Sequence, residues 1–260
     1  MTRTRRPFAL FISDLHLQVS HPRTLEAFLA FLSERAVQAE RLYLLGDIFE
    51  YWAGDDDLAD PFNARIVAAI RAVADAGTAV YWMAGNRDFL VGDAFAQAAG
   101  LKLLQDPHLI EAGARRVALL HGDAQCTLDT QYMAFRAQVR QSAWQAHFLG
   151  MPLTQRKAII AGLRQGSREA HTGKSYESVD VTPDAIDAVF LETGADVIIH
   201  GHTHRPAVHE HRHERTTRLR YVLPDWELDA EPPRGGWCAL HADGSIERHD
   251  LTELRLFQGA

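Results

Sequence analysis

Cysteine is scarce in this sequence. Only Cys126 and Cys238 occur in 260 residues, and they are far too distant to form a CxxC pair. A chain of this length can bury a core large enough to fold without disulfides. Two isolated thiols therefore favour a reducing compartment and argue against a cysteine-based structural zinc site.

Long apolar runs are also absent. The basic start of the chain is followed by an apolar run that covers only Phe8 to Ile12, which is too short for a signal-peptide core. No stretch approaches the length of a membrane-spanning helix. We therefore expect a cytoplasmic protein. The length of the chain permits one large α/β domain or two small ones, and we expect a single domain over residues 1–260.

Charge is unevenly distributed along the chain. The net charge is −7, which disfavours general nucleic-acid binding. Residues 130–176, however, contain seven basic side chains and one acidic side chain, and so carry a net charge of +6. This stretch is either a solvated helical surface or a basic cap over an anionic substrate or membrane.

Five short apolar runs each deliver a polar residue where the run ends, often beside a glycine. Their composition predicts buried strands over 8–13, 42–47, 79–86, 116–123 and 195–202. Helical spacing of apolar residues predicts helices over 22–39 and 61–76. Because α/β folds bind ligands at the carboxyl ends of strands, we expect the polar residues to meet in one crevice. They are Asp14, His16, Asp47, Asn86, His121, His202 and His204.

Residues 125–180 interrupt this pattern and are here called the lid. Apolar spacing predicts helices over 128–147 and 151–165. We expect the lid to be a helical insertion that closes over the crevice. Beyond residue 205 the chain becomes rich in strands and turns.

The seven polar residues offer oxygen and nitrogen ligands but no thiolate, which suits Mn²⁺, Mg²⁺ or iron. Seven ligands are too many for one open catalytic ion, but they suffice for two ions that share a carboxylate. Asp47 is the candidate bridge. Taken singly, Asp14 has an ordinary explanation as a helix cap and Asn86 as a turn residue. Their joint placement at strand ends favours a two-metal site.

Other histidines have simpler explanations. His200 precedes the ligand pair and is interpreted as a hydrogen-bonded core residue. His209, His211 and His213 share one face of an expected strand. They are interpreted as a solvated edge.

The motifs occur in the order DxH, GD, GN, H and GHTH, which resembles the calcineurin-like metallophosphoesterase superfamily. The resemblance implies an α/β chain folded as a two-sheet β-sandwich flanked by helices. It also implies two metal sites that share Asp47. One would use Asp14, His16, Asp47 and His204; the other would use Asp47, Asn86, His121 and His202.

The third block reads GNRD, whereas many superfamily members read GNH. Arg87 cannot act as an acid at neutral pH, but it can bind a phosphate in a bidentate grip. A reaction with this residue needs a leaving group that is already stable as an anion. Cleavage of a diphosphate meets that condition. The expected catalytic residues are Asp47, Asn86, Arg87 and His121.

Over residues 8–240 the chain is similar to the UDP-2,3-diacylglucosamine diphosphatases of bacterial lipid A synthesis. The motifs that carry the likeness are FISDLHL, LYLLGDIFEYWAGDD, GNRDFL, LLHGDAQCTLDTQYMAFR and GHTHRP. The resemblance implies hydrolysis to UMP and 2,3-diacylglucosamine 1-phosphate, manganese as cofactor, and peripheral association with the cytoplasmic face of the inner membrane. It implies substrate contacts at Asn86, Arg87, Asp129, Ser167, His171, Lys174 and His202. His171 stands where the family usually has Asn, which puts that contact in doubt.

Apolar residues of the lid either line a slot for the acyl chains or simply pack the lid on the core. They are Tyr132, Phe135, Trp144, Phe148, Leu149 and Met151. We expect no nucleic-acid partner and no obligate protein partner. The alternative functions are another nucleotide phosphodiesterase or dinucleoside polyphosphatase, and a non-catalytic scaffold on the same fold.

Overall fold

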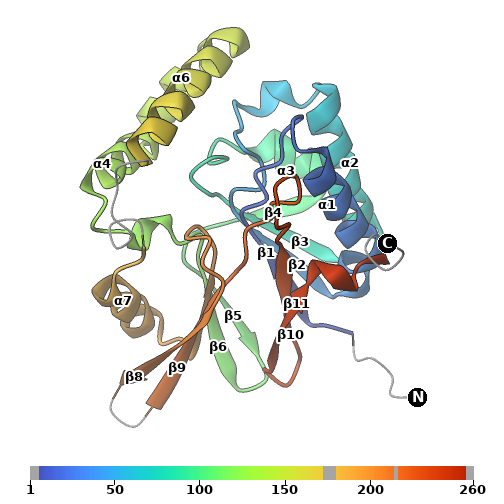
Figure 1. Ribbon diagram of the computed structural model, residues 1–260, viewed down its shortest axis with the longest axis vertical. Coiled ribbons are helices and arrows are strands. Elements are labelled where there is room, and N and C mark those ends of the chain that lie inside the picture. The colour runs from blue at the N-terminus through green and yellow to red at the C-terminus, as the bar shows by residue number, and fades with distance from the viewer. Residues whose placement is uncertain (1–5, 172–179, 214–215, 256–260) are drawn as a thin grey trace.

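The computed structural model describes residues 6–171, 180–213 and 216–255 (Figure 1). Two mixed sheets form its centre. The first has the strand order β11-β10-β1-β2-β3-β4 and the second β5-β6-β7-β9-β8. The first contains β1 (Ala9–Ile12), β2 (Arg41–Leu45), β3 (Ala79–Met83), β4 (Leu101–Leu104), β10 (Gly236–Leu240) and β11 (Ile246–Asp250). The second contains β5 (His108–Ala112), β6 (Arg115–Leu119), β7 (Val197–His200), β8 (Val208–His213) and β9 (Thr216–Val222).

β1, β7 and β10 are buried along their whole length because both faces of the sheets are covered at these strands. In β1, Phe11 lies in the core between the sheets, whereas Leu10 and Ile12 lie in the core under the helices. Each fully buried side chain of this size contributes roughly 1.5–3 kcal/mol. The layers are therefore helix, sheet, sheet and helix, which confirms the predicted two-sheet sandwich flanked by helices.

Helices cover the outer faces of the two sheets. Over the first sheet lie α1 (Pro22–Glu34), α2 (Pro61–Asp75) and α3 (Asp93–Ala99). The second sheet is covered by α7 (Pro183–Thr193), whose Ile186 and Phe190 pack on Ile198 of β7. The predicted helix over 22–39 ends early, at Glu34, and a short 3-10 turn over Ala36–Gln38 follows it.

The described part of the lid contains three helices between β6 and β7, namely α4 (Thr130–Val139), α5 (Ser142–Leu149) and α6 (Leu153–His171). Figure 1 shows α4 and α6 at the upper left, apart from α1 and α2. The single helix predicted over 128–147 is wrong, because the backbone becomes extended at Gln141. After the break, Trp144 contacts Phe89 of the body and stacks on Phe148, four residues further along α5. Within the described part of the chain, no helix is both long and apolar enough to cross a membrane.

Parallel pairing places the loops of interest at one edge of the sandwich. β1 pairs in parallel with β2, and β2 with β3. In the second sheet, β6 pairs in parallel with β7. The carboxyl ends of strands that run in parallel share an edge, so the residues after β1, β2 and β3 converge, as do those after β6 and β7.

Candidate metal centre

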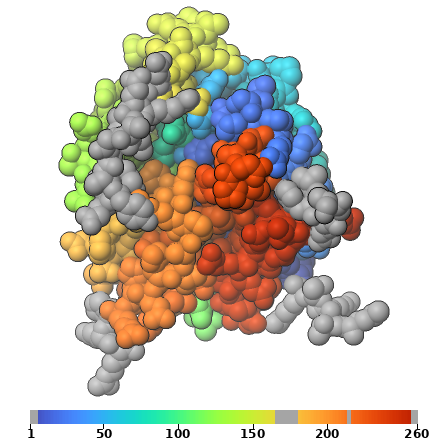
Figure 2. Space-filling view, in the orientation of Figure 1, coloured from blue at the N-terminus to red at the C-terminus, as the bar shows by residue number. Residues whose placement is uncertain are grey.

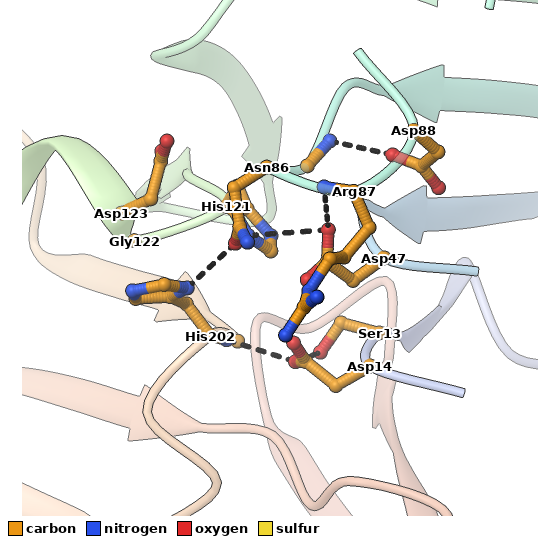
Figure 3. Close-up of polar contacts among 12 residues, drawn as sticks. Ser13, Asp14, Asp47, Asn86, Arg87, Asp88, His121, Gly122, Asp123 and His202 are labelled. Atoms are coloured by element: carbon orange, nitrogen blue, oxygen red, sulfur yellow. Dashed lines mark hydrogen bonds and ion pairs between the residues drawn. The ribbon is translucent and has the colours of Figure 1, made fainter. Parts of the chain in front are cut away.

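The seven predicted ligands lie within a few ångströms of their neighbours. Figure 3 shows Asp14, Asp47, Asn86, His121 and His202 among them. On one side, His16 Nε2 lies 3.3 Å from His204 Nε2, which lies 3.4 Å from Asp14 Oδ1. On the other side, Asn86 Oδ1 lies 3.0 Å from His121 Nε2 and 2.9 Å from His202 Nδ1.

Asp47 lies between the two groups. Its Oδ2 is 4.0 Å from His16 Nε2, and its Oδ1 is 3.8 Å from His121 Nε2. Each oxygen thus faces a different set of histidines. A carboxylate in this position can neutralise two cations at once.

Backbone conformation marks the same loops. Non-glycine residues rarely adopt positive φ, and each such residue costs about 1–3 kcal/mol unless the surrounding structure imposes it. In the described part of the chain, every non-glycine residue with positive φ is one of the predicted ligands: Asp14 (56°), His16 (48°), Asp47 (54°), His202 (68°) and His204 (54°). Strain gathered at one cluster of polar side chains indicates a functional site.

Two glycines let the ligand loops approach closely. A Cβ on Gly85 would lie 2.2 Å from Asp47 Oδ1 and 2.3 Å from the Asp47 backbone nitrogen. A Cβ on Gly201 would lie 2.2 Å from Asp14 Oδ2. The glycines therefore leave room for the ligand carboxylates themselves.

The surroundings of the Asp14 carboxylate suit a bound cation. This carboxylate is fully buried, and its Oδ2 accepts hydrogen bonds from Ser13 Oγ and the His202 backbone nitrogen. Its Oδ1 accepts no hydrogen bond within the described residues. The nearest possible donor is His204 Nε2, 3.4 Å away. A buried carboxylate oxygen that is so poorly paired is costly, and a bound cation would remove that cost.

Electrostatics favour positive charge at the centre. Although burial opposes protonation, the carboxylates of Asp47 and Asp123 raise the pKa of His121 to about 9. Burial and repulsion by His121 lower the pKa of His202 to about 4. A proton on His121 thus supplies positive charge to the free protein, and metal binding has to displace it.

Comparison with known proteins identifies the family of the chain. The family model described as calcineurin-like phosphoesterase matches residues 9–206. The chain belongs to that family. The family resemblance seen in the motifs and the fold that it implied are both confirmed.

Several curated relatives in this family carry the name UDP-2,3-diacylglucosamine hydrolase. The relative from Chromohalobacter salexigens is 48% identical over 228 residues, 88% of this chain and 90% of the relative. The one from Aromatoleum aromaticum is 49% identical over 222 residues, 85% and 90% of the two chains. The one from Bordetella parapertussis is 46% identical over 244 residues, 93% and 94% of the two chains.

Three of the predicted ligand histidines contact, through their second ring nitrogen, groups that the motifs did not reveal. His16 Nδ1 lies 3.0 Å from Glu50 Oε2, and His204 Nδ1 lies 3.5 Å from Asp225 Oδ2. His121 Nδ1 lies 2.9 Å from the Leu45 carbonyl oxygen. Such partners fix the ring orientation and leave the other nitrogen for a metal.

Asp88 is a further residue that the motif analysis missed. Its Oδ1 accepts a hydrogen bond from the Gly85 backbone nitrogen, and its Oδ2 accepts one from the Ile48 backbone nitrogen. The side chain thus ties together the loops that carry Asp47 and Asn86. Burial and the Asp47 carboxylate raise the pKa of Asp88 to about 6. Its position in the GNRD motif is the sequence feature that could have revealed it.

The predicted substrate residues are only partly covered by the structure. Arg87 is half-buried, and its side chain extends past Asp47 toward Asp14 (Figure 3). Asp129 caps α4 by accepting a hydrogen bond from the Tyr132 backbone nitrogen. The backbone of α6 passes through Ser167 and His171, but their side chains lie outside the described residues, as does the whole of Lys174.

His200 is a core residue, as predicted. It is fully buried, with Nδ1 2.8 Å from the Gly201 carbonyl oxygen and Nε2 3.0 Å from Arg220 Nη1. β8 is an edge strand on which His209 is exposed, but His211 is half-buried and lies 3.6 Å from Asp187. The side chain of His213 lies outside the described residues.

Most of the described basic residues of the lid contact the body. The partners lie mainly in the acidic segment 50–57 (Figure 2 shows α6, yellow, against the blue and cyan N-terminal half). The pairs are Arg136 with Asp123, Arg140 with the Gly85 carbonyl oxygen, Arg156 with Asp56, Lys157 with Asp57, and Arg164 with Glu50. The positive charge of the lid therefore serves first to hold the lid on the body.

The six apolar residues singled out on the lid have three kinds of environment. Phe148 is buried in the main core, and Trp144 and Met151 pack against it. For these three, ordinary packing is sufficient. Phe135 and Leu149 remain 37% and 40% exposed. Tyr132 stacks its ring on His202 and donates a hydrogen bond to Asp123.

Proposed function

We propose that this phosphoesterase hydrolyses the diphosphate of UDP-2,3-diacylglucosamine to UMP and 2,3-diacylglucosamine 1-phosphate. The observation that carries the proposal is the cluster of seven ligands around Asp47 with Arg87 beside it. The relatives named for this substrate support it, because they match over at least 85% of this chain at 46–49% identity.

The cofactor proposed is a pair of Mn²⁺ ions that share Asp47. Oxygen and imidazole ligands without a thiolate suit this metal. One ion would be held by Asp14, His16, Asp47 and His204, and the other by Asp47, Asn86, His121 and His202. Bound there, the ions would supply Lewis acidity toward a phosphate oxygen and lower the pKa of water.

The remaining chemistry falls to residues of the chain itself. The Arg87 guanidinium binds the diphosphate through two parallel hydrogen bonds. Its positive charge stabilises the negative charge that develops on the diphosphate during hydrolysis. Asp47 fixes this part of the site, because its Oδ1 accepts a hydrogen bond from the Arg87 backbone nitrogen. No residue is needed to protonate the leaving group, because a phosphate monoester leaves as a stable anion.

Substrate contacts on the lid are proposed at Asp129, Ser167, His171 and Lys174. The exposed apolar side chains on the lid suit acyl chains and a membrane surface. They are Leu128, Phe135, Leu149 and Leu163, exposed by 61%, 37%, 40% and 48%. We place the enzyme peripherally on the cytoplasmic face of the inner membrane.

Acyl dependence distinguishes this proposal from a general nucleotide diphosphatase. The test compares UDP-2,3-diacylglucosamine with UDP-N-acetylglucosamine, which has the same diphosphate but no long acyl chains. We expect turnover of the first alone, in the presence of Mn²⁺ and detergent. Equal turnover of both substrates would replace the proposal with a general nucleotide diphosphatase.

A further inference from the structure

Glu50 lies between the metal centre and the lid. It follows β2, three residues after Asp47, and its side chain is only 13% exposed. Its backbone nitrogen donates a hydrogen bond to the Leu17 carbonyl oxygen, and Leu17 forms a parallel bridge with Phe49. The residue is therefore anchored to the loops that carry the ligands after β1 and β2.

The two carboxylate oxygens of Glu50 have different partners. Oε2 lies 3.0 Å from Nδ1 of His16, whose Nε2 faces the metal centre. Oε1 accepts a hydrogen bond from Nη2 of Arg164 on α6. The Arg164 guanidinium also lies over the ring of Tyr51, 5.5 Å from its centroid. One carboxylate thus joins a ligand histidine to the lid.

The charge balance at Glu50 depends on the position of α6. With Arg164 in place, the Glu50 carboxylate shares its charge between a guanidinium and an imidazole. If α6 moves away, the carboxylate keeps only His16 as a partner among these groups. The carboxylate then loses the second contact that fixes its position, and the His16 ring, whose orientation is set by the partner of its second nitrogen, is held less firmly for metal binding.

We propose that Glu50 is a positioning residue that couples the docking of α6 to the orientation of His16, through the chain Arg164–Glu50–His16. Coupling between two sites is reciprocal. Docking of α6 therefore strengthens metal binding, and metal binding strengthens docking of α6. The proposal rests on the proposed function only in taking His16 as a metal ligand.

A second contact of α6 provides a matched control. Lys157 Nζ lies 2.7 Å from Asp57 Oδ1, two turns before Arg164 on the same helix. This pair also holds α6 to the segment 50–57, but it does not include a neighbour of a ligand histidine. Arg164→Met and Lys157→Met each remove one cation from α6 while keeping an unbranched side chain.

The test measures Mn²⁺ binding by the electron paramagnetic resonance signal of free Mn²⁺, with the full chain and no substrate. We expect Glu50→Gln to weaken binding about 10- to 100-fold. Arg164→Met should weaken it several-fold, and Lys157→Met should leave it within about twofold of the wild type. Wild-type affinity in Arg164→Met, or an equal loss in Lys157→Met, would overturn the coupling.

Hydrogen exchange along α6 supplies an independent readout. Adding Mn²⁺ should slow amide exchange over residues 153–164 in the wild type and in Lys157→Met, but not in Glu50→Gln at saturating Mn²⁺. No effect of Mn²⁺ on wild-type exchange would overturn the proposal. Both measurements omit the UDP-sugar, so they remain valid if the proposed substrate is not cleaved.

Discussion

Substitution of Gly85 by alanine tests how tightly the ligand loops are packed. The added Cβ would lie 2.2 Å from Asp47 Oδ1, whereas real Cβ contacts essentially never fall below 3.0 Å, so a shift of at least 0.8 Å is required. Rotation of the Asp47 side chain does not relieve the clash, because the Asp47 backbone nitrogen lies only 2.3 Å away. The loop itself has to move.

The expected cost follows from this shift. Overpacking of this kind costs about 1–3 kcal/mol, which lowers the Tm by roughly 2–12 °C in a domain of this size. A displacement of about 1 Å at a catalytic group costs about 10²-fold in rate. We therefore expect Gly85→Ala to retain the fold but to lose metal affinity and about two orders of magnitude in kcat.

Gly162→Ala is the matched control for this prediction. A Cβ at Gly162, an exposed position of α6, would contact nothing within 4 Å. Alanine favours a helix by up to about 1 kcal/mol over glycine, so this variant should be as stable as the wild type or slightly more stable. The assays are thermal unfolding, metal content after dialysis, and turnover. Wild-type metal content and turnover in Gly85→Ala would refute the close-packing argument, as would equal damage in Gly162→Ala.

Four further predictions follow from individual residues. Asp47→Ala should reduce activity to background because it removes the shared counter-charge, and wild-type turnover would contradict the two-metal assignment. Arg87→Ala should lower turnover by about 10²-fold with metal content intact by elemental analysis, so loss of metal would show that its role is misassigned. Burial and the Arg220 guanidinium lower the pKa of His200 to about 3 from the usual 6.5. Below pH 6.5 this histidine is therefore protonated in the unfolded chain but stays neutral in the native protein, so the free energy of unfolding falls as the pH falls from 6.5 toward 3. His200→Gln should flatten this part of the unfolding profile of chelator-treated protein, and an unchanged profile would contradict that origin. Burial raises the pKa of the Cys126 and Cys238 thiols to about 12, so native protein should resist iodoacetamide at pH 8 while denatured protein reacts at both thiols, and rapid native alkylation would contradict their burial.

Prediction from the sequence was most successful where a buried apolar strand is followed by polar side chains of the site. β1, β2 and β3 were predictable because strands covered on both faces form short, continuous apolar runs. The convergence of the seven polar residues was predictable because each lies in the loop that follows such a run. β4 was not predicted, because its four residues, LKLL, include two exposed positions and resemble a loop.

Features that depend on tertiary contacts were not predictable from local patterns. Apolar spacing continues across the break between α4 and α5, so only contacts such as that of Trp144 with Phe89 reveal it. Glu50 and Asp225 gain their roles from the ring nitrogens that face them in the fold. The basic character of the lid could be predicted from its sequence. Its partners in the segment 50–57 could not, because the fold brings together residues about 100 positions apart in the sequence.

Product analysis tests the central claim most directly. Purified protein is incubated with UDP-2,3-diacylglucosamine and Mn²⁺ in detergent, with and without a chelator, and the products are identified by mass spectrometry. The account predicts equal amounts of UMP and 2,3-diacylglucosamine 1-phosphate, both lost on chelation. An intact lipid substrate, alongside metal-dependent cleavage of a generic aryl phosphodiester, would contradict it.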